Sequence, residues 1–353
     1  MRNRLLVTGG CGFIGSNFIR YVFEKTDFDG IIVNLDKLTY AGNPLSLEDI
    51  YKKYSGRYNF ERVDICDGIR VIEILKAYKI DTVVHFAAES HVDRSIYGPA
   101  DFIQTNIVGT FTLLECVREV WKDRKDVLFH HISTDEVYGS LGEEGQFTED
   151  TPYDPRSPYS ASKASSDHLV MAYFHTYNLP VTLSNCSNNY GPYHFPEKLI
   201  PLMIINILEE KPLPVYGEGK NIRDWLYVED HADAIYRIIK KGKIGEKYNI
   251  GGGAERTNIE VVNLICEKMA EKLGKPKDYY KKLITFVKDR PGHDYRYSMC
   301  YEKIKKELGW QPAHTFEEGI DKTIGWYLAN RKWIESVKSG DYRKWIEINY
   351  KDR

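Results

Sequence analysis

The sequence predicts an α/β protein with a doubly wound parallel sheet and a smaller mixed α/β domain. Short apolar runs without polar alternation recur through the first half of the chain, and helical patterns lie between them. Such runs are typical of strands that are covered by helices on both faces. A chain of 353 residues is also long enough for about two domains.

Five apolar runs define the expected strands of the first half, and a helical pattern follows most of them. The expected strands span residues 4–8, 31–35, 58–63, 82–86 and 127–132, and the expected helices include 13–25 and 100–121. Further along, Ser157 suits the N-cap of another helix and Pro158 suits its first turn. Strands that alternate with helices in this way form a parallel sheet.

The pattern changes near residue 185. We expect an irregular stretch at 188–201, which is rich in Asn, Pro and aromatic residues, and a mixed strand or loop at 279–288. Helices are expected at 229–240 and 258–273, with a last helix at 316–330. The absence of a low-complexity linker indicates a second part that packs tightly against the first.

Composition excludes several classes of function. The formal charge of −2 provides no global basic field for nucleic acid or an anionic membrane. No apolar stretch reaches the roughly 18 residues of a membrane span, and no signal peptide is visible. The six cysteines are scattered and form no CxxC pair, which favours reduced thiols and a cytoplasmic protein.

A glycine-rich loop joins the first expected strand to the first expected helix. Glycines stand at positions 9, 12 and 15 of the segment Gly9-Gly10-Cys11-Gly12-Phe13-Ile14-Gly15. A turn this tight requires residues without a Cβ, and the helix N-terminus offers N–H groups to a pyrophosphate. The order strand, loop, helix and second strand distinguishes a dinucleotide-binding loop from an ordinary turn.

Asp36 ends the second expected strand, about 20 residues after the glycine loop, where an acidic residue can bind both ribose hydroxyls. A carboxylate there repels a 2′-phosphate, so NAD is favoured over NADP. The alternative is that Asp36 caps a turn. Asp64 and Ile65, after the third strand, are candidates for the adenine end, although Asp64 could equally cap the following helix.

Ser133-Thr134-Asp135-Glu136 follows the fifth expected strand, at the carboxyl edge of the sheet where sites of such folds lie. Adjacent side chains on a strand face opposite ways, so both carboxyls can face one substrate only if the chain turns there. Two neighbouring acids resist ionising together and can supply one acid and one base. The alternative is a polar turn with solvated charges.

Tyr159 and Lys163 are spaced i, i+4 and share one face of the helix that begins at Pro158. A Tyr phenol that acts as a base near neutral pH must have its pKa lowered by about three units from its ordinary value. A nearby ammonium group and a positively charged nicotinamide both act in that direction. The pair alone is common in amphipathic helices, but with the glycine loop it indicates catalysis.

Together these motifs resemble the extended short-chain dehydrogenase/reductases that act on nucleotide sugars, and among them the 4,6-dehydratases. The resemblance rests on residues 8–15, on Tyr159 and Lys163, and on Thr134-Asp135-Glu136. Further segments at 85–93, 188–192, 195–201, 223–225 and 289–293 match as well, so it covers about residues 4–330 in order. Epimerases and decarboxylases of the family carry a different pair after the Thr.

The resemblance implies dehydration of dTDP-glucose to the 4-keto-6-deoxy sugar nucleotide, with NAD regenerated. Tyr159 would take the proton of the 4-hydroxyl during oxidation at C4, assisted by Thr134 and Lys163. Glu136 would remove the C5 proton, and Asp135 would protonate the departing 6-hydroxyl. Elimination needs its own acid and base, which explains two carboxyls beyond the Tyr/Lys pair.

The resemblance also implies binding residues and a domain division. A Rossmann domain for NAD would comprise residues 1–187 with a return segment at about 224–252, and the nucleotide-sugar domain about 188–223 and 253–340, followed by a tail at 341–353. The implied NAD-binding residues are Gly9, Gly12, Phe13, Ile14, Gly15, Asp36, Lys37, Leu38, Thr39, Asp64, Ile65, Ala87, Ala88, Thr105, Tyr159, Lys163 and Asn189. The implied substrate-binding residues are Ser90, Thr134, Asn188, Lys198, Leu199, Pro214, Tyr216, Arg223, Asn258, Arg290 and His293.

A homodimer through the helices near 100–121 and 158–178 is implied in the same way. No metal is expected, because the adjacent His130 and His131 would point to opposite faces of a strand. Two alternatives stay open. One is another nucleotide-sugar enzyme, either a 4-epimerase or a 4,6-dehydratase for a UDP- or GDP-sugar. The other is a catalytically silent NAD-sensing protein, against which the five intact catalytic candidates argue.

Overall fold

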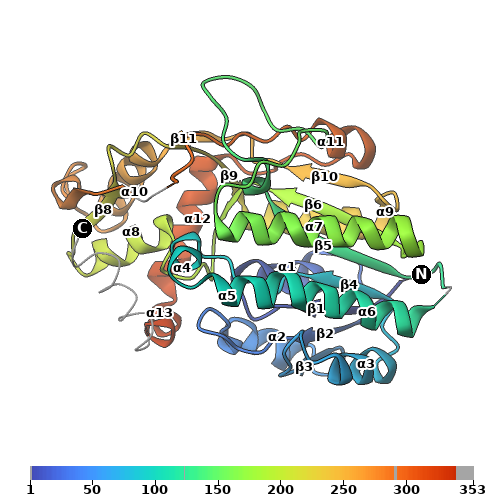
Figure 1. The fold of residues 1–353 in the computed structure, drawn as a ribbon. Coiled ribbons are helices and arrows are strands. Elements are labelled where there is room, and N and C mark those ends of the chain that lie inside the picture. The colour runs from blue at the N-terminus through green and yellow to red at the C-terminus, as the bar shows by residue number, and fades with distance from the viewer. Residues whose placement is uncertain (1, 123, 290–291, 339–353) are drawn as a thin grey trace.

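The computed structural model describes residues 2–122, 124–289 and 292–338. Its centre is a seven-stranded sheet in the order β10-β6-β5-β4-β1-β2-β3, and every neighbouring pair is parallel. Figure 1 shows these strands between two layers of helices, which confirms the α/β prediction. The strands are β1 (Arg4–Thr8), β2 (Ile31–Leu35), β3 (Tyr58–Glu61), β4 (Thr82–His85), β5 (Leu128–Thr134), β6 (Val181–Cys186) and β10 (Lys247–Ile250).

Each face of the sheet has its own hydrophobic core, because successive strand residues point in opposite directions. On β1, Leu5 and Val7 pack with α1 (Phe13–Lys25) and α9 (Val228–Lys241). Leu6, between them, packs in the opposite core with α3 (Gly68–Ala77), α6 (Thr110–Trp121) and α7 (Pro158–Tyr177). The two-sided burial explains why the strands read as continuous apolar runs.

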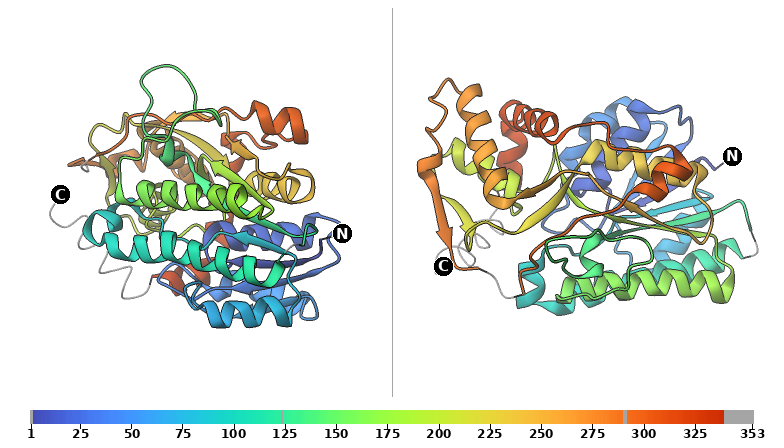
Figure 2. Two further views of the ribbon diagram at one scale, coloured as in Figure 1. Left: turned by 45° about the vertical axis from the view of Figure 1, so that its right-hand side comes forward. Right: turned by 90° about the horizontal axis from the view of Figure 1, so that it is seen from above.

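Shorter helices connect these layers. They are α2 (Glu48–Lys53), α4 (Val92–Tyr97), α5 (Pro99–Phe102) and α11 (Glu302–Leu308). The expected helix at 100–121 is composite, since a π-helical segment, Ile103–Gly109, separates α5 from α6. Figures 1 and 2 show α6 and α7 side by side on one outer face.

The second half builds two small sheets around a separate core. One sheet has the order β11-β9-β7 and the other pairs β12 with β8. The elements are β7 (Asn188–Tyr190), α8 (Leu199–Leu208), β8 (Leu213–Tyr216), β9 (Ile222–Tyr227), β11 (Glu255–Thr257), α10 (Asn258–Lys272), β12 (Ile284–Val287), α12 (Phe316–Ala329) and α13 (Arg331–Val337). Figures 1 and 2 show α8, α10 and α12 at the end away from the N-terminus.

Two expectations for the second half were wrong. Residues 188–201 are not wholly irregular, because 188–190 form β7 and α8 begins at Leu199. The helix at 316–329 is not the last, since α13 follows it and buries Trp333, whose Nε1 donates to Ser46 Oγ at 3.0 Å. Both features depend on partners far away in sequence, which local patterns do not reveal.

Segment 224–252 is divided between the sheets. Its first strand, β9, pairs with β7 and β11. In contrast, β10 is a strand of the seven-stranded sheet, and α9 packs against one face of that sheet. The expected tail at 341–353 lies outside the described residues. None of the described helices is long and apolar enough to cross a membrane.

Candidate active site

One pocket of about 420 Å³ lies between the large sheet and the second half of the chain. Most of the residues expected to bind a cofactor line it, with Leu38 and Asp64 outside its lining. All of the expected substrate-binding residues line it except Arg290, which lies outside the described residues. The catalytic candidates Thr134, Asp135, Glu136, Tyr159 and Lys163 line it too, so the structure brings the sequence-predicted sets into one place.

The glycine loop is a cradle that side chains would fill. Gly9 has a φ of +69°, and a Cβ there would lie 2.7 Å from the Cα of Ala87. A Cβ on Gly15 would lie 2.5 Å from the carbonyl oxygen of Gly9. The loop ends at Gly12, the N-cap of α1, so the first N–H groups of that helix face the site where a pyrophosphate fits.

Asp36 stands at the end of β2 with both carboxylate oxygens directed at the loop and the turn. Oδ2 accepts the N–H of Cys11 at 3.0 Å, and Oδ1 accepts the N–H of Leu38 at 2.8 Å. Each oxygen retains a lone pair for a ribose hydroxyl. The capping alternative and the ribose-binding interpretation are therefore compatible.

Asp64 lies beside this region without lining the pocket. Its Oδ1 accepts the N–H of Cys66 at 2.9 Å, and its Oδ2 lies 3.4 Å from Lys37 Nζ. The N-cap of α3 is Asp67, whose side chain accepts from Arg70 N. Asp64 therefore forms a local turn, and Ile65 presents the apolar surface to the pocket.

The chain leaves β5 at Thr134 and enters a single 3₁₀ turn, Asp135–Tyr138. The Thr134 hydroxyl accepts the N–H of Glu136 at 3.3 Å and donates to Asp135 Oδ1 at 3.0 Å. A turn here was the condition for both carboxyls to face one substrate, and Asp135 and Glu136 do line the same pocket.

The surroundings of Asp135 favour its neutral form. Burial, followed by the nearby charge of Glu136, raises the pKa of its carboxyl well above the ordinary value. Its Oδ2 is buried and has no hydrogen-bond partner within the part of the chain that the structure describes. A protonated carboxyl with an uncommitted oxygen in the pocket can donate a proton to a substrate.

Tyr159 and Lys163 project from the first turns of α7. Ser157 caps this helix by accepting the N–H of Ser160 at 3.0 Å, as expected, and Pro158 occupies the first turn. Burial, and then Glu136, raise the pKa of the Tyr159 phenol well above its usual value, while a hydrogen bond with Thr134 opposes the shift. Lys163 Nζ donates to the carbonyl of Ile132 at 2.8 Å.

The substrate end carries cations and rings. Arg223 is buried and donates to the carbonyls of Ile222 and Asp294 at 2.7 and 3.0 Å. Lys198 Nζ donates to the carbonyl of Ser90 at 3.1 Å. His293 and Tyr216 lie with their ring centroids 6.2 Å apart. Two cations near flat rings suit a pyrophosphate attached to a base.

Asn189, expected near the nicotinamide, has its side chain committed to the protein. His231 Nδ1 lies 2.9 Å from Asn189 Oδ1, and Asn189 Nδ2 donates to the carbonyl of Ser187 at 3.0 Å. Burial lowers the pKa of His231 to about 3, so its ring is neutral and Nδ1–H is the donor. The side chain amide of Asn189 is thereby fixed in one orientation.

Sequence reasoning gave no role to several pocket residues, of which Glu89 and Trp225 lie within the matching segments 85–93 and 223–225, whereas His194 and Tyr297 lie just outside matching segments. Glu89 follows Ala88, and burial raises the pKa of its carboxyl to about 7. His194 stacks on Phe13 of the glycine loop with centroids 4.0 Å apart. Trp225 and Tyr297 also line the pocket. Proximity to a motif was the one available signal, and it does not tell which neighbours turn inward.

The two adjacent histidines face opposite sides of β5. His130 Nδ1 lies 2.8 Å from Thr182 Oγ1 on β6, whereas His131 Nε2 lies 3.2 Å from Asp167 Oδ1 on α7. Within the described ranges, no group of three or more metal-ligating side chains forms a metal site.

Proteins of the short-chain dehydrogenase/reductase class place a Tyr and a Lys one helical turn apart beside a dinucleotide loop, and this geometry is of that class. A family model described as GDP-mannose 4,6 dehydratase matches residues 6–323. The chain is 57% identical over 364 residues to a dTDP-glucose 4,6-dehydratase of Salmonella typhimurium, covering 99% of each protein. The chain therefore belongs to the nucleotide-sugar 4,6-dehydratase family of extended short-chain dehydrogenase/reductases.

Solved structures agree with this assignment. A dTDP-glucose 4,6-dehydratase from Bacillus anthracis in complex with NAD is 46% identical, with a TM-score of 0.84 over 95% of this chain and 99% of that one. A UDP-glucose 4-epimerase from Thermus thermophilus, also in complex with NAD, is 28% identical with a TM-score of 0.81 over 94% and 100%. The similar TM-scores show that the fold alone does not separate the two activities, so the site must.

Proposed function

We propose that this protein dehydrates dTDP-glucose to dTDP-4-keto-6-deoxyglucose, with NAD as a cofactor that is regenerated in each cycle. The observation that carries the proposal is the pair Asp135 and Glu136 beside Tyr159 and Lys163 in one pocket. Epimerisation at C4 has no use for an additional buried acid, whereas loss of water from C5 and C6 does. The 57% identity to a protein named for this reaction supports the same choice.

The cofactor end of the pocket fits NAD. The glycine cradle admits a pyrophosphate, and Asp36 offers a carboxylate to ribose hydroxyls and a repulsive charge to a 2′-phosphate. Gly9, Gly12, Phe13, Ile14, Gly15, Asp36, Lys37, Thr39, Ile65, Ala87, Ala88 and Thr105 would hold it. When bound, NAD accepts a hydride from C4 of the sugar and returns one to C6.

Tyr159 is the base for the first step. It removes the proton of the 4-hydroxyl, and Lys163 and Thr134 support the phenolate by charge and by hydrogen bonding. Because burial raises the pKa of Tyr159, the step requires positive charge in the pocket, which Lys163 and an oxidised nicotinamide provide.

Asp135 and Glu136 divide the elimination between them. A ketone at C4 acidifies the C5 hydrogen, and Glu136 takes that proton. Asp135, held protonated by burial, gives its proton to the 6-hydroxyl, which leaves as water. Glu136 then returns a proton to C5, which completes the 6-deoxy product.

This sequence leaves one extra proton on Tyr159 and one missing from Asp135. The Thr134 hydroxyl bonds to Asp135 Oδ1 at 3.0 Å and also hydrogen-bonds with Tyr159. A hydroxyl both accepts and donates, so Thr134 can pass this proton and restore the starting state.

A substrate panel in heavy water tests the proposal. The protein is incubated with dTDP-glucose, UDP-glucose or GDP-glucose, and the products are examined by NMR. We expect a 6-deoxy-4-ketose from dTDP-glucose with solvent deuterium at C5, and none with Tyr159→Phe. Turnover of UDP-glucose but not of dTDP-glucose would show that the substrate is a UDP-sugar, while the proposed dehydration would stand. A product that retains its 6-hydroxyl would indicate a 4-epimerase, and binding of NAD without turnover of any sugar would indicate a sensor.

The same proposal includes the division of labour and the assembly. Residues 1–187 with the return segment would bind NAD, and about 188–223 and 253–340 the nucleotide sugar. We propose a cytoplasmic homodimer through residues 100–121 and 158–178. All six cysteines are free thiols, and exposed apolar side chains gather on these helices, namely Ile103, Val108, Phe111 and Tyr177. Sedimentation of the purified protein at twice the mass of one chain is the expected result.

A further inference from the structure

Asp167 is a buried carboxylate behind the pocket that the mechanism does not use. It lies on α7 one helical turn beyond Lys163, and 1% of its surface is exposed. Three donors converge on its Oδ2, namely Ser133 Oγ at 2.8 Å, Tyr153 OH at 2.9 Å and Asn185 Nδ2 at 3.3 Å. Burial raises the pKa of the Asp167 carboxyl, and Lys163 together with these three donors opposes that shift by favouring the charged form.

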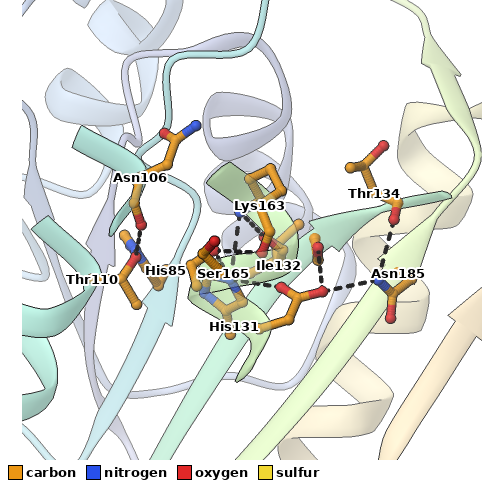
Figure 3. A network of polar contacts seen from close by, with 12 residues as sticks. His85, Asn106, Thr110, His131, Ile132, Thr134, Lys163, Ser165 and Asn185 are labelled. Carbon is orange, nitrogen blue, oxygen red and sulfur yellow. Dashed lines mark hydrogen bonds and ion pairs between the residues drawn. The ribbon is translucent and has the colours of Figure 1, made fainter. Parts of the chain in front are cut away.

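His131, labelled beside Lys163 in Figure 3, contacts both Lys163 and Asp167. Its Nε2 lies 3.2 Å from Asp167 Oδ1 and 3.4 Å from Lys163 Nζ. Burial lowers the pKa of His131 well below its ordinary value, so the ring is neutral and holds one proton. Nε2 also lies 3.3 Å from Ser166 Oγ, and neither Asp167 Oδ1 nor His131 Nδ1 has a hydrogen-bond partner in the described parts of the chain. His131 is therefore a neutral ring beside the carboxylate and supplies no charge to balance it.

Lys163 consequently has its counter-charge on Asp167. Burial lowers the pKa of Lys163, and Asp167 is the foremost group that opposes this shift. The other titratable groups that face Lys163 are His131 on β5, His85 on β4 and Cys186 on β6. Those that face Asp167 are Tyr153, Tyr138 and Lys247. Burial keeps His131 and His85 neutral, and it raises the pKa of Cys186, Tyr153 and Tyr138, which favours their neutral forms. Lys247 cannot form an anion, so the Asp167 carboxylate is the anion that can balance Lys163.

We propose that Asp167 is a positioning residue of the active site, whose ionised carboxylate keeps Lys163 charged and ties α7 to the end of β5. The tie runs through Ser133, the neighbour of Thr134, and through Asn185 Nδ2, which also donates to the Thr134 carbonyl at 3.1 Å. One carboxylate thus couples the helix that carries Tyr159 and Lys163 to the strand that ends at Thr134, directly before Asp135. This inference rests on the proposed function for its catalytic meaning and on the contacts alone for the charge pair.

The first test needs no substrate. The urea midpoint is measured between about pH 7 and 10 for the wild type, Asp167→Asn, Lys163→Met and the double variant. A buried Lys whose pKa in the folded state lies below its unfolded value of about 10.4 makes stability rise with pH up to that value. Removing the carboxylate lowers the folded pKa of Lys163 further, so the rise in Asp167→Asn begins at a lower pH and is larger. It disappears in both proteins that lack Lys163.

Two variants separate charge from packing. Tyr153→Phe deletes a hydrogen bond to Asp167 and leaves its charge, so its alkaline stability profile keeps the wild-type shape. Asp81→Asn is the matched control, because Asp81 is also buried and accepts the N–H groups of Asn3 and Arg4 at the opposite end of the sheet. We expect its profile to keep the wild-type shape as well.

A second measurement covers the case in which Asp167→Asn does not fold. Burial already raises the folded pKa of Asp167, and the charge of Lys163 opposes that shift, so in Lys163→Met the folded pKa rises further above that of the unfolded chain. Stability of this variant then falls more steeply than that of the wild type as pH rises from about 4. An unchanged acid profile would overturn the pairing.

The catalytic consequence is measured on the first step alone. dTDP-xylose lacks C6, so it can be oxidised at C4 but cannot lose water. Protonation of Asp135 therefore has no part in the measured step and does not shape its pH–rate profile. We expect Asp167→Asn to reduce NAD with this probe about 10- to 100-fold more slowly than the wild type. In its pH–rate profile, the loss of rate at alkaline pH should begin at a lower pH. Asp167→Glu should return the start of that loss towards the wild-type pH. The proposal would be overturned if the alkaline loss of rate began at the same pH in Asp167→Asn and in the wild type. It would also be overturned if Tyr153→Phe shifted that pH as much as Asp167→Asn does. If the stability results hold but no nucleotide sugar reacts, the proposed function fails and the charge pair stands.

Discussion

The cofactor end of the pocket is formed mainly by backbone groups, whereas the chemical end is formed by titratable side chains. The cofactor end consists mainly of backbone, with a glycine cradle, the first N–H groups of α1 and a turn around Asp36. The chemical end consists of buried titratable side chains, among them Asp135, Tyr159 and Lys163, whose pKa values are all shifted by burial. Substitutions at the first end should act through shape and be independent of pH, whereas those at the second should change the pH profile.

Asp135→Asn should have the largest effect, because it removes a proton donor without changing the shape of the side chain. We expect dehydration of dTDP-glucose to fall by about 10²- to 10⁴-fold while bound NAD is still reduced. Glu136→Gln should lose dehydration to a similar extent and still reduce bound NAD, because it lacks the base that removes the C5 proton. Product NMR combined with the absorbance of reduced NAD measures both steps, and full product formation by both variants would contradict the assigned roles.

The same substitution has an expected effect on stability. The folded pKa of Asp135 is raised, so the wild type loses stability as pH rises from about 4, where the unfolded carboxyl ionises, to the folded value. Asp135→Asn lacks this penalty and should be more resistant to urea at pH 7 than the wild type. The difference should vanish below about pH 4. A gain in stability with a loss of activity would show that the buried acid is kept for chemistry.

Gly15→Ala tests the other end of the pocket. The added Cβ would lie 2.5 Å from the Gly9 carbonyl oxygen, so the cradle must open. We expect NAD to bind at least about tenfold more weakly, which is about 1.4 kcal/mol, and equally so across pH. Calorimetric titration measures this, with Gly56→Ala as the control because nothing lies within 4 Å of a Cβ there. A pH-dependent loss of affinity would contradict the contrast between the two ends.

The difference between the ends also explains what the sequence could predict. The strand, loop and helix around Gly9 to Gly15 are contiguous, so the ranges of β1, α1 and β2 were predicted to the residue. The turn after Thr134 was the condition for a shared acid and base, and the structure has it. Contacts of Asp167 with Ser133, Tyr153 and Asn185 join segments that are 14 to 34 residues apart, and no local pattern reports them.

The second half of the chain shows the same limit at the level of the fold. Strand β7 has three residues and exists because Asn188 to Tyr190 pair with β9, which follows more than 30 residues later. The helices α10 and α12, by contrast, begin with capping boxes at Thr257 and Thr315 and were predicted within one or two residues. Local signals placed α10 and α12, whereas β7, α8 and α13 were not predicted.

Ser157→Ala is expected to have the smallest effect and to show where the chemical end gets its rigidity. Loss of the cap of α7 should cost about 1 kcal/mol of unfolding free energy, and Thr257→Ala, which removes the same kind of cap from α10, should cost a similar amount. Turnover should change little in either variant, because Lys163 is held by the Ile132 carbonyl and Tyr159 by Thr134 rather than by the cap. Urea unfolding and steady-state kinetics test this pair. A large loss of turnover in Ser157→Ala alone would mean that the helix start, and not the buried contacts behind it, positions the Tyr and the Lys.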